Sequence, residues 1–125
     1  MAKLKIKEIK WIPEEEEHDY PAAESYLRIL YSEDRVADMI AMFRSAAIVQ
    51  FKAKDIFRAS QLPLLSVSDS YVKKDSKKIR EGISLSPLLL LRDEPNSRVV
   101  IADGYHRLCA IYEFDEDAWI RCKII

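Results

Sequence analysis

Apolar and polar positions alternate at the start of the chain and then follow a helical period. Residues 4 to 11 predict a strand whose apolar register slips near Ile9, as a bulge would make it. Pro21 suits the first turn of a helix, because proline is favoured there. A helix is therefore predicted from about Ala22 to Tyr31.

A second helix is predicted after Ser32, whose side chain makes a good N-cap. Its apolar residues recur at the i, i+3, i+4 and i+7 spacing of a buried helical stripe, and they are Val36, Met39, Ile40 and Phe43. A short strand over Ala47 to Lys52 and a brief helical piece over Lys54 to Ser60 are predicted next. The loop that follows is broken by Pro63.

The second half of the chain predicts one more capped helix and most of a sheet. Asp69 is a suitable N-cap for a helix through Val72 and Ile79, which Gly82 ends. The remaining elements are, in order, a strand over Pro87 to Leu91, a turn over Asp93 to Ser97, a strand over Arg98 to Ala102, a helix that Gly104 opens, and a strand over Trp119 to Ile125. Together these elements predict an α/β fold in which a small mixed sheet packs against helices.

Length and composition indicate one domain, since the chain has 125 residues of which 49% are apolar. We divide it into an N-terminal strand and helices over residues 1 to 46 and a core over residues 47 to 125. Two cysteines, Cys109 and Cys122, are too few for a disulfide framework and indicate a reducing compartment. The longest uncharged apolar run, Pro87 to Leu91, is too short to span a bilayer, so we expect a cytoplasmic protein without membrane contact.

Charge is balanced overall but segregated locally. The net charge is -1, yet Glu14 to Glu17 is acidic and Lys73 to Arg80 carries five basic residues. This balance does not favour a nucleic-acid partner, because such binding depends on neutralising several phosphates. The two histidines and two cysteines match no zinc spacing, and we expect neither zinc nor haem.

The most informative stretch is IADGYHR, residues 101 to 107. Gly104 falls where the predicted strand meets the predicted helix, and a residue without Cβ lets backbone N–H groups approach a ligand closely. His106 and Arg107 then lie in the first helical turn, where a cation opposes the helix dipole unless an anion accompanies it. A phosphate is one such anion; Arg107 pairing with Asp103, and His106 bonded to a backbone carbonyl, are the alternatives. From the dipole alone we expect Arg107→Ala to leave the empty protein as stable or slightly more stable.

These residues, in their order along the chain, resemble the ParB N-terminal and sulfiredoxin superfamily. Lys78 to Gly82 followed by Pro87 to Leu90 is similar to its first motif, and Asp103 to Arg107 is similar to the Asp-Gly-x-His-Arg turn of its free serine kinase branch. The likeness covers about Phe51 to Ile125. It implies a turn that binds nucleotide phosphates, of CTP in ParB, ATP in sulfiredoxin and ADP in the kinases.

The resemblance implies a role for each site residue. Nucleotide or phosphate contacts are implied for Gly104, Tyr105, His106, Arg107, Lys74 and Lys78, with CTP, ATP or ADP and Mg²⁺ as cofactors. If a reaction occurs, it implies phosphoryl transfer, in which His106 contacts the transferred group and Asp103 holds a metal or a nucleophile. A solvated basic face is the alternative for Lys74 and Lys78.

Departures from the family narrow these expectations. Tyr105 stands where sulfiredoxin has its cysteine, so sulfinate reduction is not expected. Leu64 and Leu65 stand where ParB has a proline-arginine element, so full partition function is not expected either. The kinase branch implies a further catalytic carboxylate, which no position in the sequence identifies.

Two readings remain for the segment before the first helix. Asp19 beside His18 is suited to orient an imidazole, but a helix cap is the interpretation that we favour. The competing function is a non-enzymatic protein-interaction or DNA-associated accessory module, with Glu14 to Glu17 and the helices before residue 47 as its contact surface.

Overall fold

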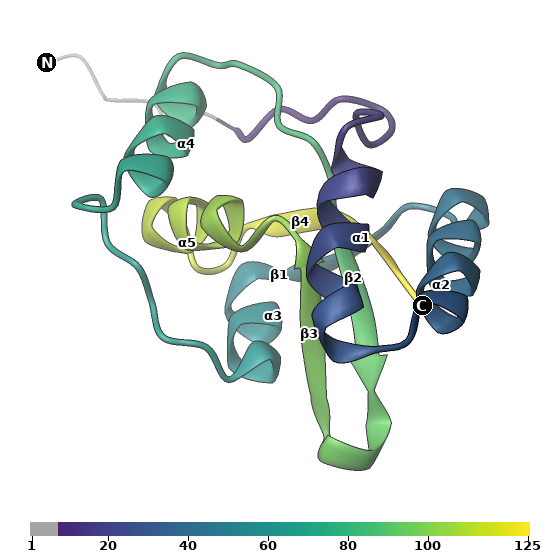
Figure 1. The fold of residues 1–125 in the computed structure, drawn as a ribbon. Helices are drawn as coiled ribbons and strands as arrows, with labels where there is room; N and C mark the ends of the chain where they lie inside the picture. Colours follow the sequence, from purple (N-terminus) through teal and green to yellow (C-terminus); the bar gives the residue numbers. More distant parts are fainter. Residues whose placement is uncertain (1–7) are drawn as a thin grey trace, which may run out of the picture.

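The computed structural model describes residues 8–125 and has a four-stranded mixed sheet at its centre (Figure 1). The strands β1 (Val49–Lys52), β2 (Leu88–Asp93), β3 (Arg98–Asp103) and β4 (Trp119–Ile124) lie in the order β1-β4-β2-β3. β1 is antiparallel to β4, β4 is parallel to β2, and β2 forms an antiparallel hairpin with β3. The predicted α/β fold with a small mixed sheet is confirmed.

Five α-helices in residues 8–125 cover the two faces of this sheet. Successive side chains of a strand point to opposite faces, and each face has its own apolar cluster. One cluster joins Leu89, Leu91, Val100 and Ala102 to α1 (Asp19–Leu30) and α2 (Glu33–Ser45). The other joins Leu88, Leu90, Val99 and Ile101 to α3 (Ala53–Ser60), α4 (Ser70–Arg80) and α5 (Tyr105–Phe114). No helix in the described part of the chain is long and apolar enough to cross a membrane.

The predicted helix starts are set by local chemistry. Ser32 accepts a hydrogen bond from the Arg35 N–H at the start of α2, and Val36, Met39 and Phe43 are buried as the stripe predicts. Asp69 accepts from two N–H groups in the first turn of α4, those of Tyr71 and Val72. These caps need only residues close in sequence, which is why the pattern alone revealed them.

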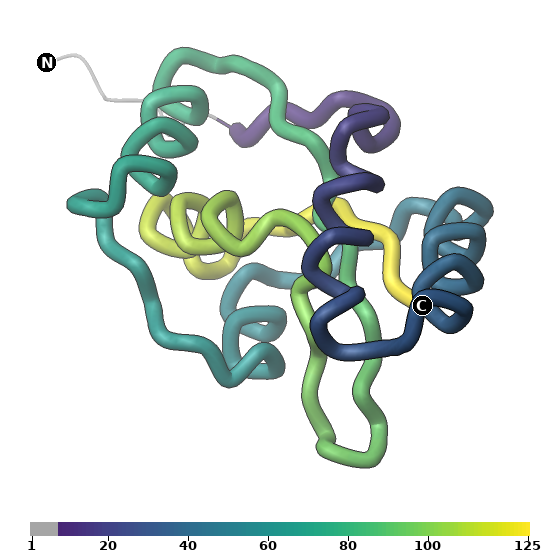
Figure 2. The backbone as a smooth tube through the Cα atoms, in the orientation of Figure 1, coloured from purple at the N-terminus to yellow at the C-terminus, as the bar shows by residue number. Residues whose placement is uncertain are grey.

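The chain before α1 differs from its prediction. Half of the predicted strand over residues 4 to 11 lies outside the described residues, and from Glu8 on it forms only an isolated bridge between Trp11 and Leu85. The Ile12 N–H donates to the Leu85 carbonyl at 2.9 Å, and the Leu85 N–H donates to the Lys10 carbonyl at 2.7 Å. Figure 2 shows this segment running beside the connection from α4 to β2. The start of α1 is thereby held next to Ser86.

Candidate functional site

Gly104 forms the turn between β3 and α5, as predicted. Its φ of 110° lies in the region that favours glycine. A Cβ at this position would lie 2.6 Å from Leu88 Cγ and 3.0 Å from Arg107 Nη2. The glycine is therefore required by the backbone conformation and by packing as well, and it gives α5 an N-cap without a side chain.

Arg107 lies in the first turn of α5 and pairs with Asp103. The Arg107 Nη2 to Asp103 Oδ2 distance is 3.0 Å, and both side chains are 16% exposed. The same nitrogen donates to the Pro87 carbonyl at 3.4 Å, whereas Arg107 Nε is buried without a hydrogen-bond partner among the described residues. The pairing that the sequence left as an alternative is thus present. Because of this ion pair, Arg107→Ala is expected to lower stability instead of preserving or raising it. The change would leave the part-buried Asp103 carboxylate without its partner.

Asp19 is buried beside this ion pair, and the interpretation of Asp19 as a helix cap is wrong. The N-cap residue of α1 is His18, and no side chain caps the helix. The Asp19 carboxylate accepts instead from the Ser86 hydroxyl and, at 3.0 Å, from the Glu16 N–H. His18 Nε2 lies 3.5 Å from Asp19 Oδ1, but its side chain is 73% exposed. Asp19 is therefore a buried acidic group at the site rather than a cap.

A polar stripe on α4 faces the start of α5. Tyr71, Lys74, Asp75 and Lys78 have the i, i+3, i+4 and i+7 spacing of one helical face. With residues 103–107 they line a pocket of about 190 Å³, which we call the α5 pocket. Every residue predicted for the site therefore lines one pocket, although residues 74 and 78 are about 30 positions from the turn in sequence.

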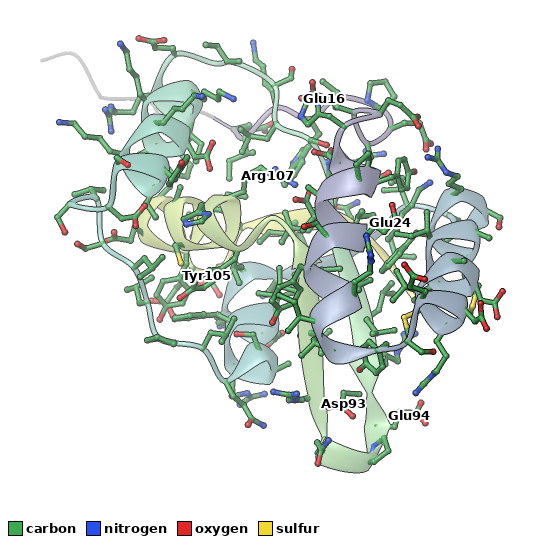
Figure 3. All side chains as sticks on the ribbon, in the orientation of Figure 1. Glu16, Glu24, Asp93, Glu94, Tyr105 and Arg107 are labelled. Atoms are coloured by element: carbon green, nitrogen blue, oxygen red, sulfur yellow. The ribbon has the colours of Figure 1, made fainter. Side chains whose placement is uncertain are left out.

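The aromatic residues of the turn have distinct surroundings. The Tyr105 hydroxyl donates to the Pro63 carbonyl, which directs it away from the ion pair. Figure 3 places Tyr105 and Arg107 on opposite sides of α5. The His106 ring lies between those of Tyr71 and Tyr105, at centroid distances of 5.1 and 5.6 Å. The contact predicted from Tyr105 is thus limited to its backbone and ring, while His106 borders the α5 pocket directly.

Two carboxylates of the α5 pocket are easier to protonate than free aspartate. Burial raises the pKa of Asp103; the Arg107 guanidinium opposes this shift, and the neighbouring Asp19 carboxyl adds to it. Burial also raises the pKa of Asp75, against the effect of Arg107, Lys78, His106 and Lys74. The cations of the α5 pocket therefore face carboxylates that bind a proton more readily than free aspartate does.

Sequence reasoning missed Tyr71 and Asp75, which line the α5 pocket, and did not connect Asp19 or Ser86 with the Gly104 turn. Asp75 had a usable signal, since it shares a helical face with Lys74 and Lys78. Asp19 and Ser86 are 67 positions apart and meet only through tertiary folding. Among residues 8–125 no group of three or more His, Cys, Asp or Glu side chains is arranged to hold a metal ion. A cation here would thus need oxygen ligands from a bound molecule as well as from Asp103.

No family model, curated protein or solved structure gives a significant match to this chain.

Proposed function

We propose that the α5 pocket binds the phosphate group of a nucleotide or of a phosphorylated small molecule. The observation that carries this proposal is the convergence of Lys74, Lys78 and Arg107 on the first turn of α5. No side chain caps that turn, and uncapped N–H groups at a helix start favour anions. The turn and the three cations together suit a phosphate better than they suit a neutral ligand.

Charge at the pocket supports an anionic ligand. Three fixed cations face the two carboxylates of Asp75 and Asp103. In the empty site Asp103 satisfies part of Arg107, and a phosphate would compete with it for the guanidinium. Arg107 Nε, which is buried without a partner among the described residues, is a further donor for an incoming oxygen.

The volume of the α5 pocket suits the phosphate groups of a nucleotide but not the whole molecule. Sites that enclose a drug-sized molecule usually measure about 300 to 1,000 Å³, whereas the α5 pocket measures about 190 Å³. We therefore expect it to enclose one or two phosphate groups, while the remainder of CTP, ATP or ADP lies across the rim.

Phosphoryl transfer is an extension of this proposal. Arg107 and the N–H groups of the turn would stabilise the charge of the transferred group, and His106 would contact it. Mg²⁺ commonly uses one or two carboxylates together with phosphate oxygens, and Asp103 would contribute such a ligand. Asp19 is a candidate for the further carboxylate that phosphoryl transfer needs to receive the acceptor's proton.

Thermal shift with CTP, ATP, ADP, GTP and tripolyphosphate, each with and without Mg²⁺, tests binding. A ligand that binds only the folded state stabilises it by about 2.7 kcal/mol at a hundredfold excess over its Kd. Lys74→Ala with Lys78→Ala should abolish most of that shift. Lys73→Ala with Lys77→Ala is the matched control, since it removes the same charge from the same helix at residues that do not line the pocket. Equal losses in both double variants would indicate non-specific charge attraction, and no shift with any ligand would contradict the proposal.

A non-enzymatic interaction module is the second candidate. It is favoured by apolar side chains exposed on α1 and α2, among them Ile29 at 80% and Met42 at 54%. The acidic segment suits this role less, because Glu17 pairs with Arg44 at 2.8 Å and both Glu14 and Glu15 contact Lys123. A stably folded protein whose melting temperature is changed by none of the ligands would favour this candidate.

A further inference from the structure

The sheet face under α3 is only partly covered. α3 has eight residues, and the β2–β3 hairpin extends beyond it (Figure 1). A pocket of about 520 Å³ opens there, which we call the α3 pocket. Its apolar lining comes from α3 and all four strands: Ile56, Ala59, Phe51, Leu90, Val99 and Ile124. It shares no residue with the α5 pocket.

The charged residues at the rim of the α3 pocket differ in whether they have a partner of opposite charge. Arg98 donates to Asp93 at 2.9 Å, and Asp55 lies 3.9 Å from Arg58, so both have a partner of opposite charge. Glu94, in the turn of the β2–β3 hairpin, also lines the pocket, and its carboxylate forms no ion pair with any residue from 8 to 125.

Arg92 differs from Arg98 and Asp55. It follows Leu88 and Leu90 on the same face of β2, at the end of the apolar floor. Its side chain forms no hydrogen bond or ion pair with any residue from 8 to 125. Within the described residues the pocket therefore presents an apolar floor bordered directly by the guanidinium of Arg92, with the Glu94 carboxylate two residues farther along the hairpin.

We propose that the α3 pocket binds an apolar molecule that carries a single carboxylate, with its hydrocarbon part on the floor and its carboxylate on Arg92. The volume lies within the range of about 300 to 1,000 Å³ that is usual for small-molecule sites, and such sites combine an apolar lining with a few polar groups. A guanidinium recognises a carboxylate through two parallel hydrogen bonds. This site does not depend on phosphate binding at the α5 pocket.

Straight-chain probes test the proposal on the whole chain, below the concentrations at which they self-associate. Octanoate and decanoate are titrated while amide shifts are followed by NMR, with decanol and decylammonium as probes of the same length but another head group. Shifts should concentrate around Ile56, Leu90 and Val99. Each added methylene should tighten carboxylate binding about fourfold, which corresponds to about 0.8 kcal/mol. Decanoate should bind more tightly than decanol, and decylammonium should bind most weakly.

Two variants separate the head group from the floor. Arg92→Gln should weaken decanoate by roughly tenfold to a hundredfold and leave decanol unchanged. Arg35→Gln is the matched control, because this exposed arginine of α2 does not line the pocket and pairs with neither of the carboxylates at its rim. Ala59→Leu should weaken every probe by filling the floor. Equal affinity for the three head groups, an equal effect of Arg92→Gln and Arg35→Gln, or shifts spread over the whole surface would each overturn the proposal, and so would the absence of binding.

Discussion

Lys123 and Arg107 are both withdrawn from solvent, yet their surroundings are opposite in kind. The Lys123 side chain is 2% exposed, and its ammonium contacts Glu14 Oε1 at 3.2 Å, the Tyr20 hydroxyl at 3.2 Å and the Arg44 carbonyl at 3.3 Å. Glu15 adds a second carboxylate at 3.6 Å. Arg107 is 16% exposed and pairs with Asp103, while its Nε has no partner in the described part of the chain.

This difference separates a structural charge from one that can recognise a ligand. An ammonium has three donors, and three oxygens at hydrogen-bond distance leave Lys123 no donor to offer. A guanidinium has five, and the contacts of Arg107 with Asp103 and Pro87 both use Nη2. Burial is thus a weaker guide to a binding site than the number of donors that remain unsatisfied.

The largest effect is expected from Lys123→Met. Glu15 has a side chain with no exposed surface, and burial already raises its pKa. Removing the cation would leave this carboxyl without its partner, so we expect a loss of about 3 to 5 kcal/mol in the free energy of unfolding. Lys54→Met is the matched control: Lys54 is 43% exposed and pairs with Asp117, and its loss should lower stability far less, because exposed ion pairs contribute little. Similar losses in chemical denaturation would contradict the structural role of Lys123.

A smaller loss is expected from Gly104→Ala, which tests the backbone that presents Arg107. The positive φ and the contact of the new Cβ with Leu88 should together cost about 2 to 4 kcal/mol. Gly82→Ala is the matched control, because Gly82 has a φ of 71° but its Cβ would meet nothing closer than 3.7 Å. It should cost only about 1 to 2 kcal/mol. Equal losses would mean that Leu88 yields without cost and that packing does not require the glycine.

The sequence predicted the fold and seven of the nine residues that line the α5 pocket, because both follow from local patterns. Caps at Ser32 and Asp69 and the glycine turn at Gly104 depend on neighbours within a few residues, and the strands follow from their apolar runs. The lysine pair emerged because helical spacing is regular.

The parts that escaped prediction depend on long-range contacts. Asp19 meets Ser86 only because the segment at Trp11 lies along Leu85. In the sequence, Lys123 occupies an ordinary polar position of an alternating strand. Its burial follows only from the packing of α1 and α2 against that face. No local pattern encodes such contacts, since they join residues 67 or more positions apart.

Arg107→Ala tests the second charge of the comparison between Lys123 and Arg107. Its loss would leave Asp103 beside Asp19 without the neutralising cation, so we expect a loss of about 1 to 3 kcal/mol in stability. Phosphate affinity, if present in the parent, should fall by about tenfold to a hundredfold. Adding Asp103→Asn to Arg107→Ala should restore most of the stability but none of the affinity. If the double variant regained no stability, Arg107 would act through packing of its side chain rather than through charge.

The smallest effect concerns Asp75, the second carboxylate of the α5 pocket. Because burial raises its pKa in the folded protein, the folded state binds this proton more tightly than the unfolded state does. Ionised Asp75 therefore lowers stability at pH 7, and this cost disappears as the pH falls through the raised pKa. Asp75→Asn should be more stable than the parent at pH 7, and the two should converge on acidification.

Asp117→Asn provides a control of opposite sign for Asp75→Asn. The hydrogen bond from Lys54 lowers the pKa of Asp117, so the folded state holds this proton less tightly than the unfolded state. This variant should be less stable than the parent at pH 7, with a difference that shrinks as the pH falls through the usual pKa of aspartate toward the lowered one. Urea denaturation of the three proteins across this range measures both differences, and carboxylates common to all of them cancel.

A difference for Asp75→Asn that has the same sign as that for Asp117→Asn would show that Asp75 is stabilised by its cations, in the manner of a satisfied ion pair. Lys74, Lys78 and Arg107 would then be matched in the empty protein as fully as Lys123 is, and the contrast between the two charge clusters would fail.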